Sequence, residues 1–100
     1  MYRQGDVLLI PVDEIPHGCE QVKRDNGRII LAYGEVTGHA HAIKNRIAKY
    51  YKSDGNNYLE LPKAATLNHE EHDTIHLPAG IYRVIQQREY TPEEIRNVAD

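Results

Sequence analysis

Turn-forming residues punctuate this chain at short intervals. Glycine, proline, asparagine and aspartate gather at Pro16-His17-Gly18, Asp25-Asn26-Gly27, Asp54-Gly55-Asn56-Asn57 and Pro78-Ala79-Gly80. The runs between these clusters are short and rich in Val, Ile, Leu and Tyr, which are residues that favour strands. We therefore predict a mainly β fold: a small β-barrel or β-sandwich of short antiparallel strands, with one short helix at the C-terminus.

Size and composition are typical of one soluble globular domain. The chain has 100 residues, of which 40% are hydrophobic and 27% are charged, so we predict a single domain over residues 1–100. No apolar run approaches the roughly 20 residues of a membrane span, and the first residues lack the apolar segment of a signal peptide. The single cysteine, Cys19, cannot form an internal disulfide. We expect a cytoplasmic protein with no membrane association.

The predicted strands follow from the apolar runs and the turns that bound them. They cover residues 6–12, 22–23, 28–33, 35–43 as a bent pair, 46–52, 58–61, 66–67, 74–77 and 80–90. Asp25-Asn26-Gly27 and Asp54-Gly55 are expected to close hairpins between the runs that flank them. Pro11 should mark an edge or a strand end. Gly38 is expected at a bulge or a close approach that turns His39 and His41 inward.

The C-terminal segment is the one place where a helix is predicted. Thr91-Pro92-Glu93-Glu94 combines a capping residue, proline at the first helical position and glutamate three residues after the cap. A helix of about two turns is too short to be stable alone. It should therefore dock on the sheet or on a partner.

Histidine is unusually frequent, and most of it falls in two short segments. The chain has six histidines. His39 and His41 belong to Gly38-His39-Ala40-His41, and alternate residues of a strand point to the same face. This pair is therefore expected to present two imidazoles side by side, an arrangement that suits two ligands of one metal ion.

The second segment, residues 68–76, is almost entirely polar. His69 and His72 have a His-x-x-His spacing that one turn or a tight loop can aim at a single point, with His76 or Glu71 as a reserve ligand. Imidazole and carboxylate groups suit divalent Zn, Fe, Ni, Cu or Mn. Since no cysteine lies near either segment, a structural zinc site of the cysteine-rich kind is disfavoured. We predict one metal site formed by His39, His41, His69 and His72.

The sequence has two resemblances to known families, of which only the second bears on the metal site. The segments GEVTGHAH (34–41) and HEEHDTIHLPAGIYRV (69–84) resemble a family of small uncharacterised bacterial or phage proteins, which implies such a source but no mechanism. Residues 34–41 and Pro78-Ala79-Gly80 also resemble the two cupin motifs in part. Arg83 stands where the last cupin histidine would be, so this likeness implies only a histidine-lined metal site in a small β-barrel.

Two functional classes follow. The favoured one is a small metal-binding β domain, with a metal-dependent reaction left open because neither substrate nor reaction is readable. The alternative is a non-enzymatic bacterial or phage interaction module that contacts a protein, a second copy or nucleic acid through sheet edges or the C-terminal helix. The basic and aromatic stretch over residues 44–52 would suit single-stranded nucleic acid, but a net charge of -3 disfavours such a partner.

Overall fold

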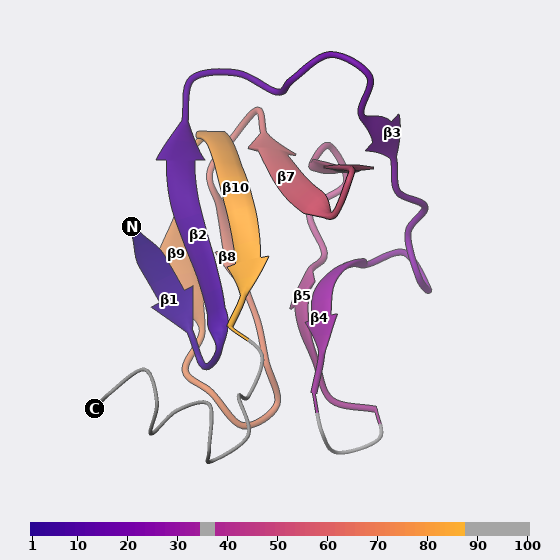
Figure 1. Ribbon diagram of the computed structural model, residues 1–100. Helices are drawn as coiled ribbons and strands as arrows, with labels where there is room; N and C mark the ends of the chain where they lie inside the picture. Colours follow the sequence, from indigo (N-terminus) through magenta and orange to yellow (C-terminus); the bar gives the residue numbers. More distant parts are fainter. Residues whose placement is uncertain (35–37, 88–100) are drawn as a thin grey trace, which may run out of the picture.

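The computed structural model describes residues 1–34 and 38–87, and all its regular structure there is β (Figure 1). The strands are β1 (Tyr2–Gln4), β2 (Val7–Val12), β3 (Glu20–Gln21), β4 (Ile29–Tyr33), β5 (Ala40–Ile43), β6 (Lys49–Ser53), β7 (Asn56–Leu61), β8 (Ala65–Leu67), β9 (Ile75–Leu77) and β10 (Gly80–Gln86). The predicted mainly β fold is confirmed. The predicted C-terminal helix, which begins at Thr91, lies outside the described residues.

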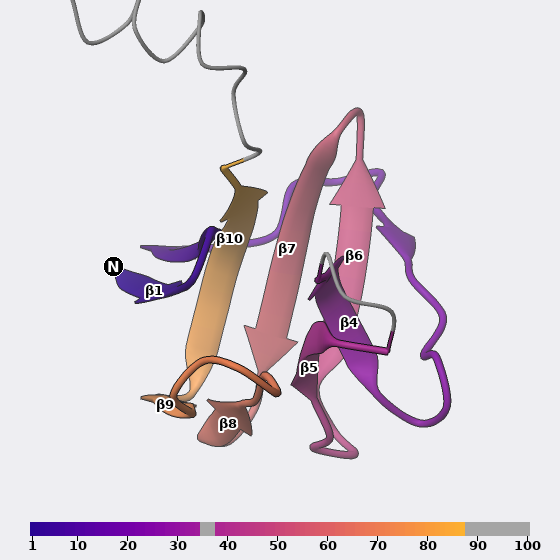
Figure 2. The ribbon, with the colours of Figure 1, turned by 90° about the horizontal axis from the view of Figure 1, so that it is seen from below.

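Six strands form one antiparallel sheet in the order β1-β2-β10-β7-β6-β3. Figure 2 shows its strands β10, β7 and β6 side by side. Its centre is the pairing of β10 with β2 on one side and β7 on the other, with Val84 opposite Leu9 and Asn57. The outer strands β1 and β3 each pair with one neighbour, β2 and β6 respectively. The sheet is therefore open, and the closed-barrel alternative is wrong for the described part of the chain.

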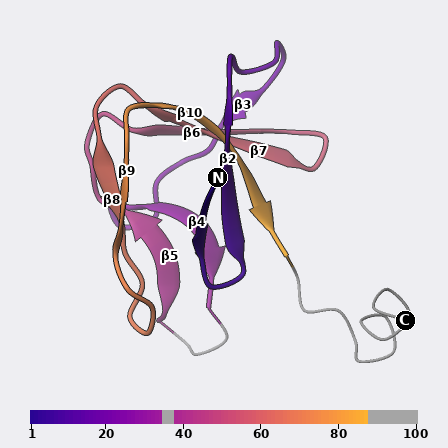
Figure 3. The same ribbon diagram turned by 90° about the vertical axis from the view of Figure 1, so that its left-hand side faces the viewer.

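The remaining strands form two hairpins, β4–β5 and β8–β9, which meet each other (Figure 3). Ala42 of β5 and Asn68, which follows β8, exchange two backbone hydrogen bonds of 2.9 Å. This antiparallel bridge places β5 beside the end of β8 and so joins the two hairpins. It also brings the segment after β8, with its histidines, beside the only histidine within β5.

One hydrophobic core joins the large sheet to the two hairpins. Its fully buried members come from both groups of strands: Val7, Leu9, Ile43, Leu59, Leu61, Leu67 and Leu77. Successive side chains of a strand point to opposite faces, which explains this burial. In β10, Tyr82 and Val84 are buried while Arg83 between them is exposed. The layers thus share a single core, in agreement with a chain of this length.

The structure confirms the predicted turns but not all of the predicted pairings between strands. Asp54 and Gly55 have φ of 46° and 82° and join β6 to β7 as predicted, since this hairpin turn needs positive φ at both positions. Asp25-Asn26-Gly27 also forms a tight turn, closed by paired backbone hydrogen bonds between Asp25 and Arg28.

The arms of that turn do not form the predicted hairpin with each other. Residues 20–21 pair with β6, and residues 29–33 pair with β5. The turn is local, but burial of Ile29 and Leu31 against distant strands decides where its arms go.

Other local predictions had mixed outcomes. Strand β1 was not predicted at all. Pro11 lies one residue before the end of β2, beyond the part of β2 that pairs with β1, as expected of a strand end. Gly38 has φ of +88°, and no heavy atom of the described residues lies within 4 Å of a Cβ built there, so the described part of the chain shows no close approach at this glycine. The predicted bulge falls partly on residues 35–37, outside the described residues. In the described residues no helix is long and apolar enough to cross a membrane.

Candidate metal centre

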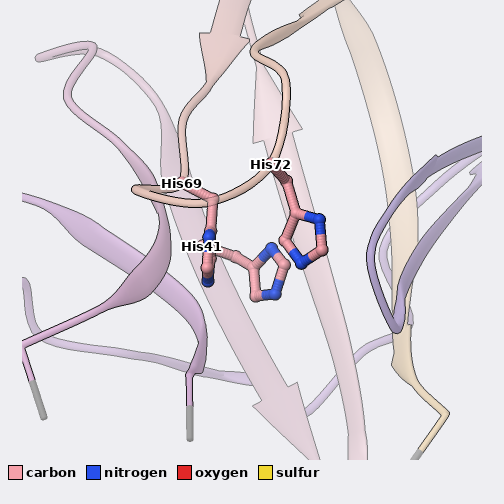
Figure 4. Close-up of side chains that lie close together, drawn as sticks. All are labelled: His41, His69 and His72. Atoms are coloured by element: carbon pink, nitrogen blue, oxygen red, sulfur yellow. The ribbon is translucent and has the colours of Figure 1, made fainter. Parts of the chain in front are cut away.

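Three of the histidines come together at the junction of the two hairpins (Figure 4). His41 lies in β5, while His69 and His72 belong to the segment between β8 and β9. The bridge between Ala42 and Asn68 brings the two segments together, because Ala42 follows His41 and Asn68 precedes His69 in the sequence. The backbone, and not only the side chains, therefore holds the group together.

The imidazoles are close enough to share one ion. One ligand nitrogen from each of His41, His69 and His72 lies within 4.8 Å of the others. The ring centroid of His69 is 4.3 Å from that of His41 and 4.6 Å from that of His72. His41 is buried and His72 is exposed, so the group runs from the core to the surface.

Gln4 orients His41 from inside the protein. Its Nε2 donates hydrogen bonds of 2.9 Å to the carbonyl oxygens of Leu67 and Asp73, which fixes the amide so that Oε1 points the other way. This Oε1 lies 2.8 Å from His41 Nδ1 and can only accept. His41 Nδ1 must therefore carry the proton, and neutral His41 has its lone pair on Nε2. Such outer contacts commonly fix the tautomer of metal-binding histidines.

The free nitrogen of His41 faces a carboxylate. Asp6 Oδ1 lies 3.4 Å from His41 Nε2, and Asp6 Oδ2 accepts a 3.0 Å hydrogen bond from Gln86. Burial lowers the pKa of His41, and the neighbouring His69 lowers it further, while Asp6 acts in the opposite direction. The neutral ring, which is the ligand form of histidine, is thereby favoured.

His69 is held differently from His41. Its Nδ1 accepts a 2.9 Å hydrogen bond from the backbone N–H of Glu71. A neutral imidazole has one lone pair, so this bond places the proton of neutral His69 on Nε2. A metal ion and the Glu71 amide would therefore compete for the same lone pair.

His72 lies against the turn that joins β1 to β2. A Cβ built on Gly5 would be 2.7 Å from His72 Nε2, and Gly5 has φ of +58°. The positive φ favours glycine at this position, and a larger residue would displace the His72 ring from where it lies. The three consecutive residues Gln4, Gly5 and Asp6 thus each contact a histidine of the group.

His39, the fourth predicted ligand, is not brought into this group. Strand β5 begins only at Ala40, and His39 Nδ1 lies 2.5 Å from Glu71 Oε2. The adjacent Glu70 accepts a 2.9 Å hydrogen bond from the N–H of Ala40, and this bond lowers the pKa of Glu70. The reserve candidate Glu71 is engaged with His39, and the reserve candidate His76 is exposed in β9.

Sequence reasoning missed Gln4 and Asp6. Gln4 lies 37 positions from His41 and 63 from Leu67, so no local spacing connects them. The one signal available was the polar run Gln4-Gly5-Asp6 at the start of the first predicted strand, residues 6–12.

Comparison with known proteins places the chain without assigning it a role. Residues 3–87 match a family model described as a domain of unknown function, DUF8820. No curated protein and no solved structure matches the chain.

Proposed function

The chain belongs to the DUF8820 family, and we propose that it binds one divalent transition-metal ion through His41, His69 and His72. The observation that carries this proposal is the convergence of three imidazoles from two separate segments to within 4.8 Å. Protonated imidazoles so close together would repel, whereas neutral ones can share a cation, so the cluster favours the metal-binding form of histidine.

The surroundings of His41 add a second line of support. The ring is 2% exposed, and its tautomer is set by Gln4 so that Nε2 is available. A buried imidazole costs free energy unless its polar atoms are satisfied, and Nδ1 has its partner. Nε2, which has the Asp6 carboxylate 3.4 Å away, is the atom that would bind the ion.

The ligand types constrain the metal to the divalent transition series. Imidazole nitrogen suits Zn, Fe, Ni, Cu and Mn, and the group contains no thiolate. We propose that His39 supports the site without binding the ion: it holds the carboxylate of Glu71, whose backbone N–H contacts His69.

Elemental analysis of protein purified without a histidine tag tests the proposal. We expect about one equivalent of metal in the wild type, and a loss of most of it in His41→Gln and His72→Gln. His72 is exposed, so its replacement should leave the fold intact even if the buried His41 is less tolerant. The matched control is His76→Gln, an exposed histidine in β9, which should keep the metal. Equal metal content in His72→Gln and His76→Gln would contradict the assignment.

A further inference from the structure

The carboxylate of Asp6 is held beside His41 by two independent contacts. Asp6 follows Gly5 in the turn before β2, and its Oδ2 accepts a 3.0 Å hydrogen bond from Gln86, the last residue of β10. Backbone pairing supports the same position, because the Gln87 N–H donates to the Asp6 carbonyl at 2.7 Å. The remaining oxygen, Oδ1, points at His41 Nε2 from 3.4 Å.

Two acceptors face each other at this point. Gln4 requires the proton of neutral His41 on Nδ1, so His41 Nε2 presents a lone pair toward an anionic oxygen. A lone pair and a carboxylate oxygen repel unless a proton or a cation lies between them. His41 is 2% exposed, so bulk water does not relieve the conflict on its side.

The distance of 3.4 Å between Asp6 Oδ1 and His41 Nε2 is also the distance expected between two ligands of one metal ion. In a tetrahedral zinc site, with metal–nitrogen and metal–oxygen bonds of about 2.0–2.1 Å, neighbouring ligand atoms lie about 3.4 Å apart. A carboxylate joined to the ion through a water molecule would stand farther from the ligating nitrogen. The pair therefore matches one edge of a coordination tetrahedron. Asp6 is not among the groups whose ligand atoms all lie within 4.8 Å of one another, so its side chain would move toward His69 and His72 as the ion binds.

We propose that Asp6 is the fourth ligand of the metal centre, so that His41, His69, His72 and Asp6 complete its coordination. This inference rests on the proposed metal binding. Its consequence is a closed site, since four protein ligands leave a tetrahedral ion no position for substrate or water. The ion would tie the turn before β2 to β5 and to the segment between β8 and β9, and its role is to stabilise the domain.

Cobalt provides the test, because Co²⁺ replaces Zn²⁺ in such sites and its visible spectrum reports coordination. Metal-free wild-type protein is titrated with Co²⁺ and then with azide, an anion that binds only where the ion has an open or water-filled position. The variant is Asp6→Asn, which keeps an oxygen for the bond from Gln86. The control is Asp13→Asn, an exposed aspartate just beyond β2.

The inference predicts an intense four-coordinate spectrum in the wild type and in Asp13→Asn, unchanged by azide. Asp6→Asn should bind Co²⁺ at least about 10-fold more weakly, the smallest effect typical of even an outer-shell partner, and its spectrum should respond to azide. Equal affinity and equal azide response in the wild type and Asp6→Asn would overturn Asp6 as a ligand while leaving the histidine site intact. A wild type that binds no Co²⁺ would overturn both proposals.

Discussion

Gln4 and His41, which are 37 positions apart, are joined by a 2.8 Å hydrogen bond that determines which nitrogen of the imidazole is free. The bond is directional because Gln4 uses its amide nitrogen for two carbonyl groups, those of Leu67 and Asp73. One buried amide therefore links the β1 strand, the β5 histidine and both ends of the segment that carries the other histidines. The metal proposal depends on this link.

Replacing Gln4 by alanine should weaken both the fold and the centre. Loss of an outer-shell partner typically costs about 10- to 100-fold in metal affinity. Each buried carbonyl left without its donor costs about 1–3 kcal/mol of unfolding free energy. Urea unfolding and competitive Zn²⁺ titration measure the two effects. Gln21→Ala, on an exposed face of β3, is the control and should change neither. Wild-type Zn²⁺ affinity in Gln4→Ala would show that the tautomer of His41 does not matter.

Substitution at Gly5 separates a steric effect on the site from simple backbone strain. Gly5 and Gly18 both have positive φ, +58° and +86°, so alanine at either should destabilise the protein by roughly 1–2 kcal/mol. At Gly5 the new Cβ would meet His72 Nε2, at 2.7 Å, whereas at Gly18 no heavy atom of the described residues lies within 4 Å of the new Cβ. Gly5→Ala should therefore lower Zn²⁺ affinity and Gly18→Ala should not. Equal affinities in calorimetric titration would remove His72 from the site.

Metal binding should release the backbone N–H of Glu71. In the metal-free protein this N–H donates to His69 Nδ1 at 2.9 Å. To bind the ion, His69 must use the same Nδ1 lone pair or move its proton from Nε2 to Nδ1, and either change breaks this hydrogen bond. Hydrogen exchange followed by NMR should show faster exchange at Glu71 once Zn²⁺ is added. The internal control is the Ala42 amide, whose 2.9 Å bond to Asn68 does not involve a side chain. Unchanged protection at Glu71 in zinc-saturated protein would exclude His69 as a ligand.

The stability of the metal-free protein should fall in mild acid. Burial lowers the pKa of His41 in the fold below its ordinary value near 6.5, so below that pH the unfolded chain binds a proton that the folded chain resists. The contribution of neutral His41 to the free energy of unfolding is therefore complete above about pH 6.5 and is lost as the pH falls through the pKa of His41 in the folded protein. Urea midpoints measured in chelator from pH 8 to pH 5 test this. His41→Gln should flatten the decline and His76→Gln should not; the same slope in all three proteins would contradict the account.

Local sequence was sufficient for the turns and for much of the strand pattern. Asp54-Gly55 forms the predicted hairpin because the two positive φ values are properties of those residues and their neighbours. The pairing of β3 with β6 and of β4 with β5 was missed, since it depends on which distant apolar surfaces bury each other. Strand β1 is too short for periodicity to reveal it.

The same distinction applies to the site. The His-x-x-His spacing correctly suggested that His69 and His72 would lie together, because a short loop can place both. His39 and His41 would point to the same face only if one continuous strand ran through both residues. β5 instead starts at Ala40, after Gly38 with its φ of +88°, and His39 turns to Glu71. Gln4 and Asp6 could not be found, because only the β1–β2 turn places them beside His41.

Calorimetric titration of metal-free, untagged protein with Zn²⁺ at pH 7.5 measures directly whether the three histidines bind an ion. We expect a stoichiometry of one. At free Zn²⁺ of 100 times Kd, mass action stabilises the fold by about 2.7 kcal/mol, which corresponds to a rise in Tm of about 10–20 °C for a domain of this size. His72→Gln should lose most of this rise. If Zn, Fe, Ni, Cu and Mn all give no heat of binding and leave the Tm unmoved, the histidines hold no metal, and an interaction module becomes the better account.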